Sequence, residues 1–362
     1  MMIAGGGTGG HLFPGIAIAE AFLKKDGENE ILFVGTERGL EKRVLKELGY
    51  PLETLDIEGI KGRSWKRSIQ AAFKIPGSIM QAYKIISKYS PDVVIGVGGY
   101  ASGPAVLTAH FMGIKTAIAE QNALPGVTNR ILSKFVDKIF LSFPDRGKWF
   151  PEARSMVTGN PIRASFDTGR EMLKKKEEGP FQILIFGGSQ GAHAINIAVL
   201  AAAAELEKSR EKLQFIHQTG EKDVREIRDA YKRLNMSAEV HPFIMDMAKA
   251  YQEADLLICR AGATSVAEIT AMGKAAILIP FPFAINDHQT KNAEILVHAQ
   301  AAIMIPEKDL SGRHLADTIE RLTGHPETIE DMSKRSKALG NFRAADDVAE
   351  ACIKMATSQI LH

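Results

Sequence analysis

Short apolar runs and longer mixed stretches alternate along most of this chain. The short runs are rich in Ile, Val, Leu and Phe, as buried strands are, and the stretches between them repeat apolar residues at the spacing of a helix face. Strands are therefore expected at 1–4, 31–34, 93–97, 115–119 and 138–141, and again at 182–186, 214–218, 238–241, 256–259 and 275–279. This alternation predicts an α/β fold in which helices cover both faces of parallel sheets.

The pattern divides into two similar halves. A turn cluster, Gly159-Asn160-Pro161-Ile162-Arg163, ends the first half, and the pattern then restarts with a charged helix around 174–178. Residues 315–360 are expected to be helical. The first strand has only four residues before a run of glycines, which is typical of a frayed edge strand or of a trimmed start. A length of 362 residues exceeds one ordinary core and also favours two domains.

Each half places a glycine-rich loop directly after a strand. The first reads GGGTGGH at 5–11, before a helix expected at 14–25, and the second reads GGSQG at 187–191, before a helix expected at 192–207. Bare N–H groups at a helix start favour a phosphate, although a tight turn without a ligand would use the same residues. Gly5, Gly7 and Gly10 also match a dinucleotide fingerprint, but Glu37 lies later than a ribose-binding acid should.

His11 follows the first glycine loop directly. An imidazole titrates near neutrality, so His11 suits a general base or a hydrogen-bond donor to phosphate, and a capping or packing histidine is the alternative. Other strand ends in this half carry Ser102 and the tripeptide Glu120-Gln121-Asn122. Such polar groups suit a ligand rich in hydroxyl and amide groups, while local turn capping would explain Ser102 or Asn122 singly.

The second half offers a nucleotide-like site at 260–268. This segment follows a buried strand and opens a helix with small and hydroxyl residues, so its N–H groups could meet a diphosphate and Glu268 could bind a ribose. Alternatively, Thr264 or Ser265 is the N-cap and Glu268 its capping-box partner. Further on, Asp287, Gln289 and Asn292 lie on adjacent turns of an expected helix, where they could bind sugar hydroxyls.

Composition narrows the class of partner. The 45 Lys and Arg nearly cancel the 43 Asp and Glu, so no overall field favours nucleic acid. Two isolated cysteines exclude a disulfide framework and a zinc site and favour a reducing compartment. No aspartate-rich metal motif, basic leader or apolar run of about 18 residues is found, so a cytoplasmic protein without a metal is expected.

One segment departs from this balance of charge. Residues 59–91 contain no Asp or Glu, and their basic residues alternate with apolar ones such as Trp65, Phe73 and Ile75. The basic residues are Lys61, Arg63, Lys66, Arg67, Lys74, Lys84 and Lys88. A basic amphipathic surface binds anionic bilayers, with about 1 kcal/mol from each cation near the surface. A helix pair with a buried apolar face and solvated lysines is the alternative.

Taken in order, these motifs resemble those of the MurG family of N-acetylglucosaminyltransferases, which convert lipid I to lipid II in bacterial peptidoglycan synthesis. The resemblance runs from residue 3 to about residue 305 and rests on the two glycine loops, 98–104, 120–129, 260–268 and 287–293. It implies a GT-B fold, with two Rossmann-like parallel-sheet domains facing across a cleft. The implied domains are 1–161 for the acceptor and the membrane, with a C-terminal helix at 342–362 returning to it, and 162–341 for UDP-GlcNAc.

The resemblance also implies the site residues. The implied catalytic base is His11, and attention turns to it because Ala119 stands where such sequences often carry His. The implied contacts to the acceptor diphosphate are Thr8, Gly9, Gly10, Ser102, Gly103, Glu120 and Asn122. The implied donor site comprises Arg163, Ser189, Gln190, Ile244, Ala263, Thr264, Ser265, Glu268, His288 and Gln289, with Glu268 on the ribose and Gln289 on the sugar. The implied membrane contacts are Lys61, Arg63, Trp65, Lys66, Arg67, Phe73 and Ile75.

The reaction implied by the resemblance is an inverting transfer without metal or cofactor. The C4 hydroxyl of N-acetylmuramic acid in the lipid I acceptor would attack UDP-α-GlcNAc and form a β-1,4 link. The implied partners are UDP-GlcNAc, a polyprenyl-diphosphate-linked muramyl-pentapeptide and the anionic inner face of the plasma membrane, where the protein would be peripheral. The implied process is cell-wall biogenesis, on which cell shape and division depend. The alternatives are another lipid acceptor, an NAD-dependent oxidoreductase, and a nucleotide-sugar-binding protein without catalysis.

Overall fold

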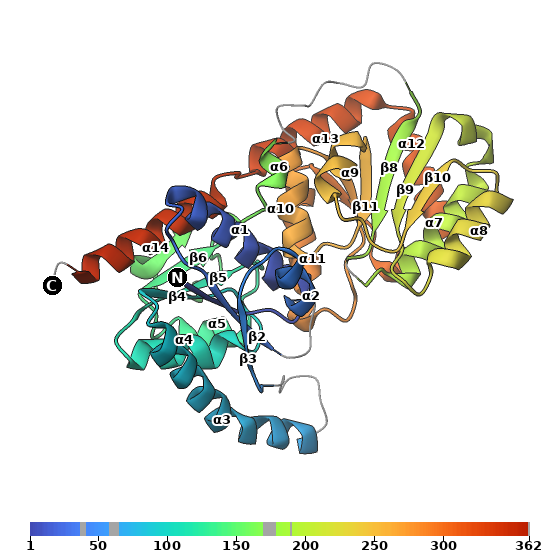
Figure 1. Cartoon of the computed structure of the whole chain (residues 1–362). Helices are drawn as coiled ribbons and strands as arrows, with labels where there is room; N and C mark the ends of the chain where they lie inside the picture. The colour runs from blue at the N-terminus through green and yellow to red at the C-terminus, as the bar shows by residue number, and fades with distance from the viewer. Residues whose placement is uncertain (37–40, 58–64, 169–178, 189, 361–362) are drawn as a thin grey trace. The chain divides into compact units, whose positions relative to one another are not determined.

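A computed structural model describes residues 1–36, 41–57, 65–168, 179–188 and 190–360. The chain forms two compact units, Met1–Ala164 with Phe342–His362, and Ser165–Asn341 (Figure 1). The chain therefore leaves the first unit once and returns to it at its C-terminal end. The family resemblance implies boundaries after residues 161 and 341.

The first unit is built on a seven-stranded parallel sheet in the order β3-β2-β1-β4-β5-β6-β7. Its strands are β1 (Met2–Ala4), β2 (Leu32–Thr36), β3 (Leu52–Leu55), β4 (Val93–Gly96), β5 (Lys115–Glu120), β6 (Lys138–Leu141) and β7 (Ser155–Val157). β1 pairs with both β2 and β4, so the expectation of a frayed edge strand is wrong. Three buried residues suffice there because neighbours on both sides bind the backbone.

Helices cover both faces of this sheet. They are α1 (Gly9–Lys25), α2 (Glu41–Glu47), α3 (Trp65–Tyr89), α4 (Ser102–Phe111), α5 (Val127–Leu132) and α14 (Ala344–Ile360). Side chains alternate across β1: Ile3 packs in one core with α1 and α14, while Met2 and Ala4 pack in a second core with α3 and α4. The parallel α/β class predicted from the pattern is therefore confirmed.

Helix α1 begins inside the glycine motif. It runs from Gly9 to Lys25 with Thr8 as its N-cap, so it starts earlier than the expected 14–25. The reason is that Gly9, Gly10 and His11 adopt helical geometry although glycine is a poor helix former. The first-turn N–H groups of α1 consequently belong to the glycine motif itself.

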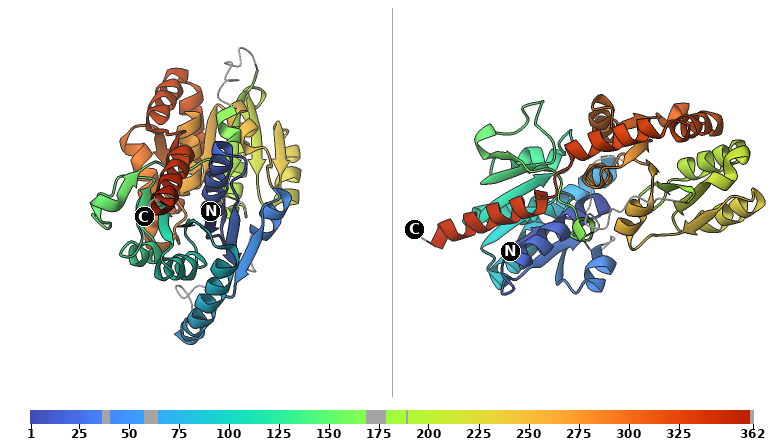
Figure 2. Two further views of the ribbon diagram at one scale, coloured as in Figure 1. Left: turned by 60° about the vertical axis from the view of Figure 1, so that its left-hand side comes forward. Right: turned by 90° about the horizontal axis from the view of Figure 1, so that it is seen from above.

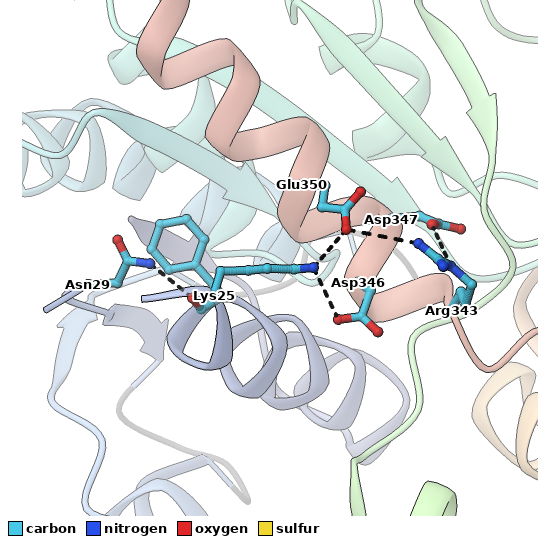
Figure 3. A network of polar contacts seen from close by, with 7 residues as sticks. Lys25, Asn29, Arg343, Asp346, Asp347 and Glu350 are labelled. Atoms are coloured by element: carbon cyan, nitrogen blue, oxygen red, sulfur yellow. Dashed lines mark hydrogen bonds and ion pairs between the residues drawn. The ribbon is translucent and has the colours of Figure 1, made fainter. Parts of the chain in front are cut away.

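The C-terminal helix α14 lies alongside α1 (Figures 1 and 2). Val348 and Cys352 are fully buried in the core that α1 also lines. At the surface, the ammonium of Lys25 lies 2.7 Å from a carboxylate oxygen of Glu350, and Arg343 lies 3.5 Å from Asp347 (Figure 3). The Lys25 ammonium lowers the pKa of Glu350, but exposed ion pairs contribute little, so the buried face of α14 provides most of the attachment.

The second unit is built on a six-stranded parallel sheet in the order β10-β9-β8-β11-β12-β13. Its strands are β8 (Phe181–Phe186), β9 (Leu213–Gln218), β10 (Ala238–His241), β11 (Leu256–Cys259), β12 (Ala275–Leu278) and β13 (Ala302–Met304). Its helices are α6 (Ser165–Thr168), α7 (His193–Glu205), α8 (Val224–Arg233), α9 (Met247–Glu253), α10 (Ala263–Met272), α11 (His288–His298), α12 (Gly312–Thr323) and α13 (Pro326–Leu339). One core packs α7, α8, α12 and α13 against the strands.

Every strand expected from the sequence is present, but β3, β7 and β13 were not expected. These three lie at the edges of the two sheets, and β7 and β13 are only three residues long. Short edge strands carry too few alternating residues to stand out in a pattern. The charged helix expected around 174–178 lies outside the described residues. Within the described part of the chain, no helix is both long enough and apolar enough to cross a membrane.

Candidate functional site

The strand order of each sheet reverses at one position. In the first sheet the reversal lies between β1 and β4, and in the second it lies between β8 and β11. Loops on the two sides of a reversal leave in opposite directions, which leaves room for a ligand at the carboxyl ends of the strands. The glycine loops at 5–8 and 187–192 follow β1 and β8, and the segments at 97–101 and 260–262 follow β4 and β11. Each unit therefore has one candidate site.

In the first unit the two loops at the reversal touch through bare backbone. A Cβ atom on Gly5 would lie 2.5 Å from the carbonyl oxygen of Gly98, and a Cβ atom on Gly99 would lie 2.5 Å from that of Gly6. All four glycines also have positive φ angles, between +83° and +156°. No other residue type fits these positions without moving the loops apart.

The orientation of His11 is fixed by two neighbours. Its Nδ1 atom lies 3.3 Å from the amide oxygen of Gln121, whose own amide nitrogen donates to the carbonyl of Ala119. A Cβ atom on Gly98 would lie only 2.5 Å from Nδ1, so the ring packs directly on that glycine. The Gln121 oxygen can accept a hydrogen bond from Nδ1. In the tautomer that carries its proton on Nδ1, the lone pair is on Nε2.

The residues expected at the acceptor diphosphate fall into two groups. Thr8, Gly9, Gly10, Gly103 and Asn122 have solvent-accessible surface, whereas Ser102 and Glu120 are buried. The carboxylate of Glu120 accepts hydrogen bonds from the backbone of Asn122 and Gly126 and from the side chain of Asn129, at 2.9 to 3.0 Å. Glu120 therefore shapes the 120–129 loop from inside.

Glu41 is a site residue that the sequence did not reveal. It is fully buried at the start of α2, and its carboxylate accepts a hydrogen bond from the backbone of Gly7 in the first glycine loop. The expected position of a ribose-binding acid pointed to Glu37, at the end of the second strand, and Glu41 lies further along the chain. The only sequence signal is a Glu shortly after that strand.

In the second unit, α10 begins at Ala263 with Gly262 as its N-cap. Thr264 and Ser265 lie inside its first turn, so the alternative of a capping box with Glu268 is wrong. Glu268 is buried, at 5% exposure, and one of its oxygens accepts a hydrogen bond from the Tyr251 hydroxyl at 3.3 Å. The first turn of α10 thus presents backbone N–H groups at the strand reversal, as an anion site requires.

The guanidinium of Arg260 binds other groups of the protein and is almost buried. Its guanidinium forms an ion pair with Glu307 and donates to the carbonyls of Ile279 and Pro280 at 3.2 and 3.1 Å. It also lies 5.3 Å from the ring centre of Phe281. Because these contacts join the ends of β11 and β12, Arg260 fixes the relative position of two loops of the candidate site.

The segment before α11 has a constrained backbone. Asn286 and Asp287 both have positive φ angles, 56° and 54°, which Asn and Asp tolerate better than most residues. The side-chain oxygen of Gln289 accepts from the backbone of Phe281 at 2.9 Å, and buried Asn292 donates to the carbonyl of Ala261 at 3.2 Å. Asn292 therefore lies behind the surface, where it supports the 260–263 turn rather than facing solvent.

The other expected site residues are distributed as follows. Arg163 belongs to the first unit, where its guanidinium lies 4.5 Å from the ring centre of Phe13 in α1. Gln190 is exposed and Ala263 is buried, and Ile244 and His288 are partly exposed. Ser189, Lys61 and Arg63 lie outside the described residues. Trp65, Lys66, Arg67 and Phe73 belong to α3, as does Ile75, which is half-buried.

A buried polar network lies behind the second glycine loop. The two ring nitrogens of His217 lie 3.1 Å from the Tyr231 hydroxyl and 3.1 Å from the amide oxygen of Asn196. Asn196 in turn donates to Asp223 at 2.7 Å. Burial lowers the pKa of His217 to about 3, so this histidine is neutral at physiological pH. Among the described residues, no group of three or more His, Cys, Asp or Glu is arranged to hold a metal ion.

Comparison with known proteins gives a consistent result. Residues 1–141 match the glycosyltransferase family 28 N-terminal domain, and residues 182–348 match the glycosyltransferase family 28 C-terminal domain. A UDP-N-acetylglucosamine–N-acetylmuramyl-(pentapeptide) pyrophosphoryl-undecaprenol N-acetylglucosamine transferase of Syntrophus aciditrophicus is 60% identical over 98% of both chains. One from Citrifermentans bemidjiense is 48% identical over 98% of this chain and 99% of its own. The crystal structure of MurG from Acinetobacter baumannii matches with a TM-score of 0.78 and 33% identity over 98% of both chains.

Proposed function

The chain belongs to the MurG family within glycosyltransferase family 28, and from this we infer that it transfers N-acetylglucosamine from UDP-GlcNAc to lipid I. Lipid I is the undecaprenyl-diphosphate-linked muramyl-pentapeptide, and the product is lipid II. The observation that carries this conclusion is the 60% identity to a transferase of that name, sustained over 98% of both chains. This identity extends over nearly the whole length of both chains and is not confined to a single motif.

The transfer makes one bond and breaks one. The C4 oxygen of N-acetylmuramic acid forms a bond to the anomeric carbon of GlcNAc, and the bond from that carbon to the β-phosphate oxygen breaks. The UDP keeps the electron pair, and the hydroxyl proton passes to a base. Attack from the face opposite to UDP converts the α-linked donor into a β-1,4-linked product.

We propose that the second unit binds the donor through the first turn of α10. Backbone N–H groups of Ala263, Thr264 and Ser265 point out of the helix start, where the helix dipole favours the diphosphate. The negative charge on UDP grows as the bond to the sugar breaks, and fixed dipoles stabilise that charge without having to reorganise. Buried Glu268 supports a role in binding the ribose hydroxyls, because its carboxylate is a hydrogen-bond acceptor that the Tyr251 hydroxyl holds in place.

We propose His11 as the general base of the first unit. In the tautomer in which Nδ1 donates a hydrogen bond to the Gln121 oxygen, the lone pair lies on Nε2, and the ring packs on Gly98, which touches the first glycine loop at Gly5. The first-turn N–H groups of α1 at Gly9 and Gly10 suit the acceptor diphosphate. A base beside the acceptor diphosphate is close to the substrate whose hydroxyl must lose a proton. General-base catalysis requires this proximity.

We further propose that the protein works as a peripheral protein on the inner face of the plasma membrane, since a polyprenyl chain holds lipid I there. Helix α3 supports this role with exposed Met80 and Tyr83, at 56% and 51% exposure, beside its basic residues. Two of the cations of this region are paired within the protein: Lys74 lies 2.9 Å from Asp56, and Lys88 lies 3.4 Å from Glu53. This pairing makes Lys74 and Lys88 weaker candidates for contact with anionic lipid.

The test of the proposed function is turnover of a lipid I analogue. The purified chain should transfer GlcNAc from UDP-GlcNAc to the analogue and release UDP, with far slower release from UDP-glucose and UDP-galactose. The product should carry a β-1,4 link. Binding of UDP-GlcNAc without transfer to the lipid I analogue, or faster transfer to an unrelated lipid such as diacylglycerol, would overturn the proposal.

A further inference from the structure

Gln218 joins two segments that belong to different neighbours of its strand. It is the last residue of β9, which lies between β8 and β10, and its side chain is 2% exposed. Its amide nitrogen donates to the carbonyl of Gly188, 2.9 Å away, in the glycine loop after β8. Its amide oxygen accepts from the N–H of Ile244, 2.8 Å away, in the segment after β10.

The backbone around Gln218 is closely packed. A Cβ atom on Gly191 would overlap the carbonyl of Thr219, and one on Gly220 would overlap the carbonyl of Gln190. The N–H groups of Thr219 and Gly220 donate to the carbonyls of His241 and Pro242 at 3.0 and 3.1 Å. The turn at 219–220 is thus wedged between the glycine loop and the 241–244 segment.

We propose that Gln218 is a positioning residue of the donor site, which sets the separation between the glycine loop and the segment at Ile244. This inference rests on the proposed function, because it takes the ligand to be a uridine diphosphate sugar bound by the second unit. A primary amide is suited to the task, since it offers a donor and an acceptor on opposite sides of one rigid plane. No charge is introduced, so the buried position costs little.

The role of Gln218 differs from general support of the fold in one measurable way. In this proposal UDP-GlcNAc contacts both the glycine loop and the segment at Ile244, so its affinity depends on their separation. UMP is shorter and cannot span a site in the same way, so a change in separation should weaken it less. A variant that merely loosens the unit would weaken both ligands alike.

Two substitutions separate the effects of the two hydrogen bonds that Gln218 makes. Gln218→Glu keeps an oxygen for the Ile244 N–H but places a second acceptor opposite the Gly188 carbonyl, which repels it. Gln218→Met keeps the volume and removes both hydrogen bonds. The matched control is Gln182→Met, because Gln182 is also nearly buried and makes an amide hydrogen bond, to Gln214 at 3.1 Å, but at the opposite end of the same sheet.

The experiment measures direct binding of UDP-GlcNAc and UMP to the full chain by titration calorimetry, together with thermal unfolding. Gln218→Glu loses one buried hydrogen bond and Gln218→Met loses both, so each should raise the Kd for UDP-GlcNAc at least about tenfold. The Kd for UMP should change less than that for UDP-GlcNAc. Gln182→Met should lower the melting temperature to a similar extent and leave both Kd values unchanged.

Three results would overturn the inference: an unchanged Kd for UDP-GlcNAc in a folded Gln218→Glu protein, equal losses for UDP-GlcNAc and UMP, or the same loss in Gln182→Met. A failure of the proposed function looks different. In that case the wild-type chain binds UDP-GlcNAc and the Gln218 variants show the predicted loss, yet no GlcNAc reaches the lipid I analogue. If the wild-type chain binds no UDP-GlcNAc, both conclusions fall.

Discussion

Both carboxylate oxygens of Glu41 lie 3.1 Å from the backbone nitrogen of Gly7. Glu41 also accepts hydrogen bonds from the backbone and the hydroxyl of Thr36, at 3.3 and 3.0 Å, and a Cβ atom on Gly6 would lie 2.8 Å from it. The carboxylate therefore occupies the inner side of the first glycine loop. By directing the Gly7 N–H inward, it fixes the conformation that leads into the exposed first turn of α1.

Glu41→Ala should destabilise the first unit by about 2 kcal/mol, because it removes a buried charged acceptor of hydrogen bonds from Gly7 and Thr36. The loop would also relax, so KM for the lipid I analogue should rise while the Kd for UDP-GlcNAc stays the same. Glu41→Gln keeps one accepting oxygen and should show a smaller loss. Urea unfolding and steady-state kinetics measure these effects, and wild-type stability in Glu41→Ala would contradict the assignment.

His11→Ala should lower kcat by about 100-fold to 10,000-fold, the range for loss of a general base, with the Kd for UDP-GlcNAc unchanged. Gln121→Met removes only the partner of Nδ1, so it should lower kcat less and shift the pH dependence of kcat, since both tautomers then become populated. Turnover near the wild-type rate in His11→Ala would remove this residue from the role of base.

Glu268→Ala should raise the Kd for UDP-GlcNAc by at least about tenfold, as expected for loss of hydrogen bonds to a charged group. Tyr251→Phe is the matched control: it deletes the 3.3 Å hydrogen bond to Glu268 but leaves the carboxylate in place. Its effect on the Kd should be clearly smaller. Calorimetric titration distinguishes the two, and equal losses would mean that Glu268 acts only through its contact with Tyr251.

The stability of the second unit should fall as the pH drops below about 6.5. Burial lowers the pKa of His217 to about 3 from 6.5, so between these values the unfolded chain binds a proton that the native state excludes. Above pH 6.5 this effect is absent, and below it the free energy of unfolding decreases by about 1.4 kcal/mol per pH unit. In urea unfolding at pH 7.5 and pH 5, His217→Gln should show a smaller difference than the wild type. Equal differences would argue against a neutral His217.

Replacing Lys61, Arg63, Lys66 and Arg67 by Gln in one variant should reduce flotation of the chain with anionic vesicles. Each cation near the membrane surface contributes about 1 kcal/mol to the binding free energy. Raising the salt concentration should weaken wild-type binding in the same direction. Gln at Lys74 and Lys88 provides the control, because Asp56 and Glu53 already pair with these two lysines. An equal loss per neutralised cation in the two variants would indicate that net charge alone governs binding.

Much of the fold could be predicted from local pattern. Buried parallel strands are nearly continuous apolar runs, so β6, β10 and β11 have the predicted bounds, and the glycine loops mark where two of the strands end. The motifs around them also identified the family. These features are local in the sequence, because a few consecutive residues determine a strand, a turn or a helix start.

Pairing of distant segments could be decided only by the tertiary structure. Nothing near residue 1 indicates that β1 lies in the middle of a sheet, since that depends on β2 and β4 meeting it from both sides. The same holds for Glu41 under the glycine loop and for Gln218 between Gly188 and Ile244. Hydrogen bonds of this kind join residues far apart in the chain, and only the packing of helices on the sheets brings them within reach. The sequence by itself therefore determined the elements and the family, and the fold determined which side chains hold the site in place.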